Sequence, residues 1–144
     1  MTLTQRLIEA TPDEVWDVLA DGWLYPLWVV GASRMREVDA AWPKEGAEIH
    51  HSVGAWPALL DDTTIVEECV AGHRLRLTAR TRPFGEAAVT LCLDPAGDQT
   101  LVTIREDVVG GPGRVVPRPV RAPLIRWRNT ETLRRLAYLA ERRV

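Results

Sequence analysis

Hydrophobic and polar residues alternate with a period of two over most of the chain between residues 33 and 109, which is typical of β-strands. A similar alternation predicts a first strand over residues 2–10. Gly, Pro and Asp residues divide the longer region at intervals typical of an antiparallel meander. The six strands predicted there are 33–39, 46–53, 58–70, 74–82, 86–94 and 100–109.

Two short helical segments are predicted between the first two strands. Residues 11–14 read T-P-D-E, where Thr11 can cap the helix and Glu14 can complete a capping box. Gly22 is predicted to end this helix in a left-handed conformation, which glycine adopts without strain. The aromatic segment 23–30 predicts a second, shorter helical piece.

A long amphipathic helix is predicted from about Pro123 to Arg142. One face of this helix collects the residues with i, i+3, i+4 spacing. These residues are Ile125, Asn129, Leu133, Leu136, Ala137 and Ala140. Such a face must be buried, and the sheet is the only large partner that the pattern offers. The sequence therefore predicts one α+β domain over residues 1–144, with the sheet packed around the C-terminal helix.

The composition is that of an ordinary globular domain, with 46% hydrophobic and 26% charged residues among 144. No apolar run approaches the roughly 18 residues of a membrane span, and the N-terminus lacks the pattern of a secretory signal. Cys69 and Cys92 form no C-x-x-C motif and are expected to be reduced thiols. We therefore expect a cytoplasmic protein with no membrane span.

Charge is distributed unevenly along the chain. Residues 114–144 carry nine arginines and two acids, a net charge of +7, so the remainder carries −9 of the total of −2. Such asymmetry is compatible with a nucleic-acid or membrane surface. A basic helix packed against an acidic sheet explains it better, because a nucleic-acid patch usually includes loops or aromatic residues that read or stack on bases, whereas these arginines belong to a helix with an apolar stripe. We expect no nucleic-acid binding.

Several strings resemble the START-like or SRPBCC superfamily, which includes polyketide cyclases and lipid-transfer domains. They are T-P-D-E-V-W-D-V-L-A-D-G at 11–22, W-P-K-E-G-A-E-I-H-H-S-V-G at 42–54, D-T-T-x-V-x-E at 62–68, G-H-R-L at 72–75, T-L-V-T-I-R-E-D at 100–107 and R-W-R-N-T-E-T-L-R-R-L at 126–136. The resemblance implies a helix-grip fold. In this fold a curved antiparallel sheet of about seven strands, with two short helices after the first strand, surrounds the C-terminal helix and encloses an apolar pocket.

Strand alternation places His51 on the inward face of strand 46–53, together with Ile49. An inward histidine is either a satisfied core residue or a group that hydrogen-bonds a ligand or acts as a general base. His50 points to the opposite face, so the two adjacent histidines cannot readily share a metal ion. We expect no metal site and no cofactor.

The same argument places two carboxylates inside. Glu106 shares the phase of Val102 and Ile104, and Glu68 shares that of Thr64 and Val66. A buried carboxylate needs a partner or a raised pKa. Each acid is therefore either a polar anchor in the pocket or half of an ion pair, with Arg105 or Arg76 as candidate partners. Asn129, on the buried face of the helix, is either a similar polar anchor or a core residue bridged to solvent.

Aromatic residues complete the set of candidates. The aromatics of segment 23–30 are either plain core packing or, with Trp28 preferred, a ligand wall. Trp56 lies at a predicted hairpin tip where it could form a lid.

The leading functional hypothesis is the binding of a small hydrophobic molecule, lipid-like or polycyclic, with Glu106, His51 and Asn129 orienting its polar atoms. The alternatives are a polyketide cyclase or dehydratase, for which no catalytic residues are assigned, and a protein-interaction module that uses the Arg-rich helix.

Overall fold

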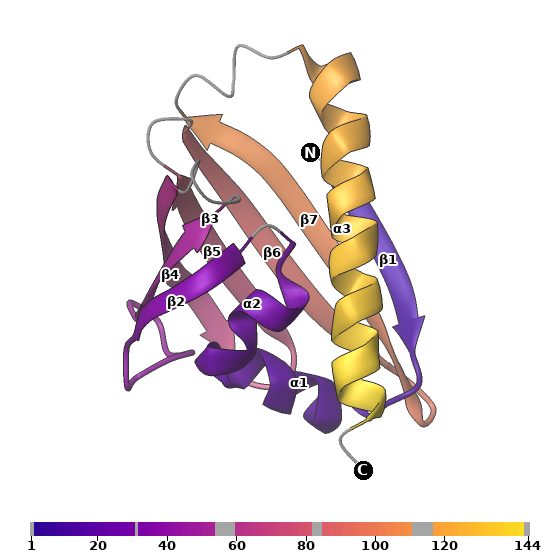
Figure 1. Cartoon of the computed structure of the whole chain (residues 1–144). Coiled ribbons are helices and arrows are strands. Elements are labelled where there is room, and N and C mark those ends of the chain that lie inside the picture. Colours follow the sequence, from indigo (N-terminus) through magenta and orange to yellow (C-terminus); the bar gives the residue numbers. More distant parts are fainter. Residues whose placement is uncertain (1, 31, 54–59, 82–84, 111–116, 143–144) are drawn as a thin grey trace.

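The computed structural model describes residues 2–30, 32–53, 60–81, 85–110 and 117–142. Its elements follow the predicted order of one strand, short helices, six strands and a long helix (Figure 1). The strands are β1 (Thr2–Ile8), β2 (Ala32–Val38), β3 (Glu48–Val53), β4 (Leu60–Val70), β5 (Arg74–Thr81), β6 (Gly85–Ala96) and β7 (Gln99–Gly110). The helices are α1 (Pro12–Ala20), the 3-10 helix η1 (Gly22–Leu24), α2 (Tyr25–Trp28) and α3 (Arg118–Glu141).

Within these described residues, seven strands form one antiparallel sheet in the order β1-β7-β6-β5-β4-β3-β2. Helix α3 lies along the concave side next to β1, and α1 and α2 pack against it from the β2 side (Figure 1). Strands β2 to β7 each pair with their neighbours in the sequence, and β1 pairs with β7 at one edge of the sheet. The predicted helix-grip arrangement is confirmed.

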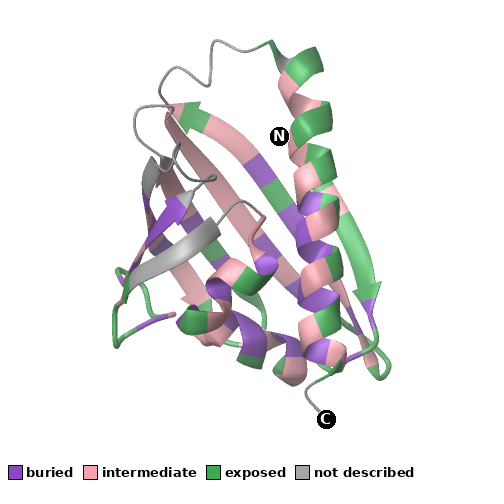
Figure 2. Cartoon of the chain, in the orientation of Figure 1, coloured by how far each residue is buried: buried purple, intermediate pink, exposed green. Residues whose placement is uncertain are grey.

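The core lies between the concave face of the sheet and the helices (Figure 2). Six residues that share one phase on β5, β6 and β7 are buried: Leu75, Leu77, Leu91, Leu93, Val102 and Ile104. Arg74 and Arg76 are exposed on the opposite face. Ala79, Ala87 and Val89 belong to the inward phase but are only half-buried, because they line a cavity.

Helix α1 begins as predicted, since the Thr11 side chain accepts a hydrogen bond from the Glu14 amide and the Glu14 carboxylate accepts one from the Thr11 amide. The role predicted for Gly22 is wrong. Gly22 is not among the glycines with positive φ. A Cβ there would lie 2.6 Å from Val38 Cγ1 and 3.1 Å from Trp42 Cδ1, so Gly22 permits close packing of η1 against these side chains.

Helix α3 begins at Arg118, five residues before the predicted start at Pro123. Proline has no N–H, so Pro123 cannot bond to the carbonyl of Pro119 one turn earlier. Both prolines are exposed, and water can satisfy that carbonyl in place of the helix. The helix therefore passes through Pro123 near its first turns, where the loss is smallest.

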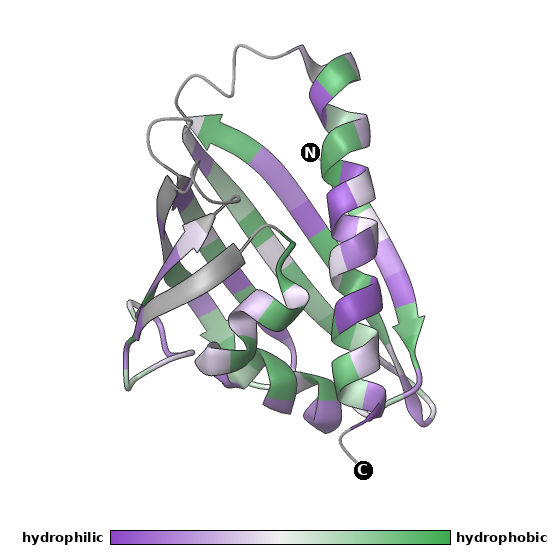
Figure 3. Cartoon of the chain, viewed as in Figure 1, coloured by the Kyte–Doolittle hydropathy of each residue, from purple (hydrophilic) through white to green (hydrophobic). Residues whose placement is uncertain are grey.

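Hydrophobic and hydrophilic residues alternate around α3 (Figure 3), and several of its arginines pair with acids. Arg121 lies 3.9 Å from Asp107 of β7. Arg134 and Arg135 both bond to Glu131, at 2.6 and 3.1 Å. The hydrogen bonds from Arg134 and then Arg135 lower the pKa of Glu131 to about 2. None of the described helices combines the length and the hydropathy of a membrane span.

Candidate functional site

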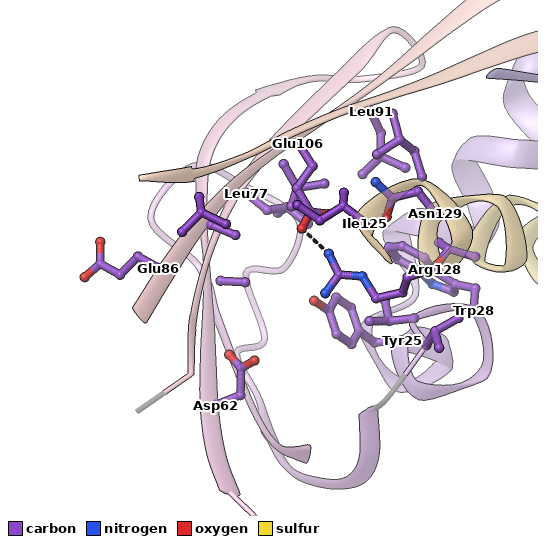
Figure 4. A pocket seen from close by; sticks show the side chains of 18 of the residues that line it. Tyr25, Trp28, Asp62, Leu77, Glu86, Leu91, Glu106, Ile125, Arg128 and Asn129 are labelled. Atoms are coloured by element: carbon purple, nitrogen blue, oxygen red, sulfur yellow. Dashed lines mark hydrogen bonds and ion pairs between the residues drawn. The ribbon is translucent and has the colours of Figure 1, made fainter. Parts of the chain in front are cut away.

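A cavity of about 300 Å³ lies between the concave face of the sheet, α2 and α3 (Figure 4). Strands β5, β6 and β7 give it an apolar wall because their alternate residues share the concave face. This wall includes Leu77, Ala79, Ala87, Val89, Leu91 and Ile104. The volume falls at the lower end of the roughly 300–1,000 Å³ typical of small-molecule pockets.

Glu106 of β7 and Arg128 of α3 form a hydrogen-bonded ion pair on the wall of the cavity (Figure 4). Glu106 is 4% exposed, whereas the Arg128 side chain is 41% exposed. A carboxylate buried to this degree needs such a partner. The partners considered from the sequence, Arg105 and Arg76, are both exposed residues of the sheet, and the long helix supplies the cation in their place.

A second polar group surrounds Thr64 of β4, which is completely buried. The Tyr25 hydroxyl lies 3.1 Å from Thr64 Oγ1, and His51 Nε2 lies 3.4 Å from the same oxygen. His51 Nε2 is also 4.0 Å from Asp62 Oδ1. The rings of Tyr25 and His51 are 4.9 Å apart between centroids. Tyr25, His51 and Asp62 all line the cavity, so this group forms a continuous polar part of its wall.

The electrostatic environment keeps the Tyr25 phenol protonated. Burial raises its pKa well above the ordinary value, the hydrogen bond with Thr64 opposes this, and the nearby Asp62 carboxylate raises the pKa further. Smaller effects come from Arg128, which lowers it, and Glu106, which raises it. The phenol is therefore available as a hydrogen-bond donor on the cavity wall at neutral pH.

Two further donors on the cavity wall lack a partner among the described residues. They are Trp28 Nε1 on α2 and Asn129 Nδ2 on α3. Each residue is only 3% exposed. A buried N–H without an acceptor is unfavourable by about 1–3 kcal/mol. An acceptor atom of a ligand, or of a water molecule, in the cavity would remove this penalty.

The sequence profile of the family described as polyketide cyclase / dehydrase and lipid transport matches residues 2–141. The chain belongs to this family. The resemblance drawn from the sequence motifs is thereby confirmed. A search of curated proteins found no match to the chain.

Solved structures of the same fold include a protein from Rhodobacter sphaeroides, 25% identical, with a TM-score of 0.76 over 99% of this chain and 92% of that one. The Zhui aromatase/cyclase from a Streptomyces species is 15% identical, with a TM-score of 0.74 over 99% and 93% of the two chains. A protein from Chromobacterium violaceum is 20% identical, with a TM-score of 0.71 over 95% and 94%. At these identities the likeness concerns the fold.

The fold brings four of the six predicted site residues to the cavity. These are Trp28, His51, Glu106 and Asn129. Trp56 lies outside the described residues. No group of three or more His, Cys, Asp or Glu residues in the described part of the chain is arranged to hold a metal ion.

The inward orientation predicted for Glu68 is wrong. The β4–β5 register shifts between Val66 and Glu68, so β4 contains a bulge at this point. A single extra residue reverses the inward and outward phases of the rest of a strand. Glu68 therefore pairs in register with the exposed Arg76 and forms an ion pair with Arg74, away from the cavity.

Five polar residues of the cavity were not selected from the sequence: Tyr25, Asp62, Glu86, Arg128 and Thr132. The signal for Asp62 was present, because it shares the period-two phase of Thr64 with no bulge between them. Arg128 lies next to Asn129 and three residues after Ile125, both on the predicted buried face. Tyr25 lies in the aromatic segment 23–30, for which the sequence favours Trp28 as the ligand wall.

Proposed function

We propose that this protein binds a small, mostly apolar molecule that carries one or more polar atoms. The observation that supports this most strongly is the division of one cavity into an apolar wall and a polar wall. The sheet supplies the apolar wall. The ion pair of Glu106 with Arg128 and the group around Thr64 supply the polar one.

The two walls have different roles in this proposal. Transfer of apolar groups from water to the sheet supplies affinity, at about 0.8 kcal/mol for each buried methylene. The polar wall fixes the orientation of the ligand, because a ligand polar atom that enters the cavity must exchange its hydrogen bonds with water for hydrogen bonds with protein. Membership of a family whose description includes lipid transport supports the same assignment.

A cavity-filling variant tests this proposal. Ala87 lines the cavity, and its neighbour Ala88 alternates to the other face of β6. With the uncharged dye Nile red as probe, we expect Ala87→Phe to weaken binding at least about tenfold, because the new ring occupies the ligand volume. The matched control, Ala88→Phe, should bind the dye as the wild type does.

Circular dichroism would establish that both variants fold. Equal dye affinity in the folded Ala87→Phe variant and the wild type would contradict binding in this cavity. Native mass spectrometry of the purified protein would then identify any molecule that the wild type retains and the Ala87→Phe variant loses.

A polyketide cyclase or dehydratase is the second candidate function, and the surroundings of His51 favour it. His51 lies near Asp62 and next to Tyr25 on a wall that also presents Arg128, so a potential base and two potential donors face one cavity. Proton abstraction beside a carbonyl needs a base together with a donor for the developing oxyanion.

Turnover of a short poly-β-keto thioester would test the second candidate. If His51 is the base, His51→Gln should lower kcat by about 10²–10⁴ while the thioester still binds. Binding without turnover by the wild type would leave the carrier function as the supported one.

A further inference from the structure

We propose that Glu106 is a specificity-determining residue that makes the cavity select uncharged ligands with an acceptor oxygen and reject carboxylates. This inference rests on the proposed binding function and deepens it. It follows from the charges of the cavity wall and from the two buried donors there. The ligand class that it names is a ketone, ester or alcohol with an apolar body, in contrast to a fatty acid.

The first step concerns the cation. Arg128 is the only arginine or lysine among the described residues that line the cavity, and it is bound to Glu106. A ligand carboxylate would have to displace Glu106 from Arg128 or share the guanidinium with it. Because Glu106 is 4% exposed, displacement would leave a buried carboxylate without its partner, which is strongly unfavourable.

The second step concerns the anions. Three carboxylates line the cavity: Asp62, Glu86 and Glu106. Glu86 is bound to Arg80 at 2.7 Å, and Asp62 lies 4.0 Å from His51. A ligand carboxylate that leaves the existing pairs intact would therefore lie on the same cavity wall as the carboxylates of Glu106 and Asp62. Like charges in a partly desolvated site disfavour each other, so either mode of entry opposes an anion.

The third step concerns the donors. Trp28 Nε1 and Asn129 Nδ2 are buried on the cavity wall and have no acceptor among the described residues. Both are neutral, so they can bind an uncharged oxygen without any compensating charge. A hydrocarbon would leave them unpaired and an ammonium group offers no lone pair to accept from them. The donors thus favour a carbonyl, ether or hydroxyl oxygen.

The test compares probes of equal chain length in competition with Nile red: methyl decyl ketone, dodecanoate, dodecylamine and dodecane. For the wild type we expect the ketone to bind at least about tenfold more tightly than dodecanoate, as expected for a charge opposed by like charge. The ketone should also bind more tightly than dodecylamine and dodecane.

Glu106→Gln isolates the role of the carboxylate. The amide keeps the shape of the side chain but leaves the charge of Arg128 without its counter-ion. We expect the affinity ratio of dodecanoate to ketone to rise at least about tenfold. The matched control is Glu131→Gln. It removes the acid that pairs with Arg134 and Arg135 of α3, the helix that also carries Arg128, but Glu131 does not line the cavity. This variant should leave the affinity ratio unchanged.

Trp28→Phe and Asn129→Leu examine the donors. Each should lower the ratio of ketone affinity to dodecane affinity by about 3- to 10-fold, the effect of one hydrogen bond. Because the readout is a ratio between two ligands of one folded variant, a general loss of packing affects both and cancels.

Two kinds of failure are distinguishable. If the wild type binds dodecanoate or dodecylamine at least as tightly as the ketone, or if Glu106→Gln does not raise the dodecanoate ratio, the selectivity proposal is overturned while the binding function stands. If no probe displaces Nile red and Ala87→Phe binds the dye like the wild type, the binding function itself fails.

Discussion

Thr64→Val is the most direct test of the polar group on the cavity wall. Valine keeps the branched shape and the strand preference of threonine, so the hydroxyl is the only group removed. That hydroxyl is completely buried and lies 3.1 Å from the Tyr25 hydroxyl and 3.4 Å from His51 Nε2. The substitution therefore removes one well-placed hydrogen bond and one long one from the interior.

The expected loss is about 2 kcal/mol in the free energy of unfolding. A typical hydrogen bond contributes about 1 kcal/mol, and the total loss is about 1–3 kcal/mol where a buried donor is left unpaired. We place the value in the middle of that range because the Tyr25 side chain faces a cavity that water can enter, which offers a substitute partner. Tyr25→Phe, which removes the other end of the bond, should cost about 1 kcal/mol.

The double variant decides whether the bond accounts for these losses. Once Tyr25 is phenylalanine, Thr64→Val no longer leaves a phenol unpaired. The two losses should therefore fall short of additivity by about 1 kcal/mol in a double-mutant cycle. Urea unfolding followed by tryptophan fluorescence measures all four proteins.

Thr63→Val is the matched control for this cycle. The Thr63 hydroxyl lies 3.3 Å from His50 Nδ1, and both side chains are only part-buried. The loss there should stay within about 0.5 kcal/mol. Additivity of Thr64→Val and Tyr25→Phe to within about 0.3–0.5 kcal/mol would refute the proposed hydrogen bond.

Three further measurements address other parts of the molecule. Gly22→Ala should destabilise the protein by about 1–3 kcal/mol in urea unfolding, because its Cβ would lie 2.6 Å from Val38. In a Tyr138→Phe variant Tyr25 is the only tyrosine, and ultraviolet absorbance should show no tyrosinate in the folded protein at pH 10, the ordinary pKa of a tyrosine. Because the pKa of Tyr25 is higher in the folded state than in the unfolded state, the free energy of unfolding should fall as the pH rises above 10. Ionisation of Tyr25 at pH 10 without unfolding would contradict its burial. NMR titration should give Glu131 a pKa of about 2. Its contribution to stability is therefore present above pH 4.5, the ordinary pKa of this carboxyl, and is lost as the pH falls through about 2. A measured pKa near 4.5 would contradict the pairing of Glu131 with Arg134 and Arg135.

Local periodicity was enough to predict the sheet and the orientation of most of its side chains. A strand must turn alternate residues to opposite faces, so His51 and Glu106 could be placed inside from their apolar neighbours alone. The capping box of Thr11 and Glu14 was equally readable, because both residues belong to one helical turn. In each case the physical cause acts over a few residues, and the sequence therefore contains it.

Tertiary structure decided the features that depend on residues far apart in the chain. The bulge between Val66 and Glu68 arises from the pairing of β4 with β5, and it turned Glu68 outward although the pattern up to Val66 was regular. Gly22 is required by the side chains of Val38 and Trp42, which approach it only after folding.

The partner of Glu106 is the clearest case of this kind. Period-two alternation showed that a carboxylate would be buried and would need a cation, but it gave no means of choosing among the arginines. The choice of Arg128 depends on how α3 lies across the concave face of the sheet, which no local pattern encodes. The sequence determined which side chains face inward, and the packing of the helix on the sheet decided which of them meet.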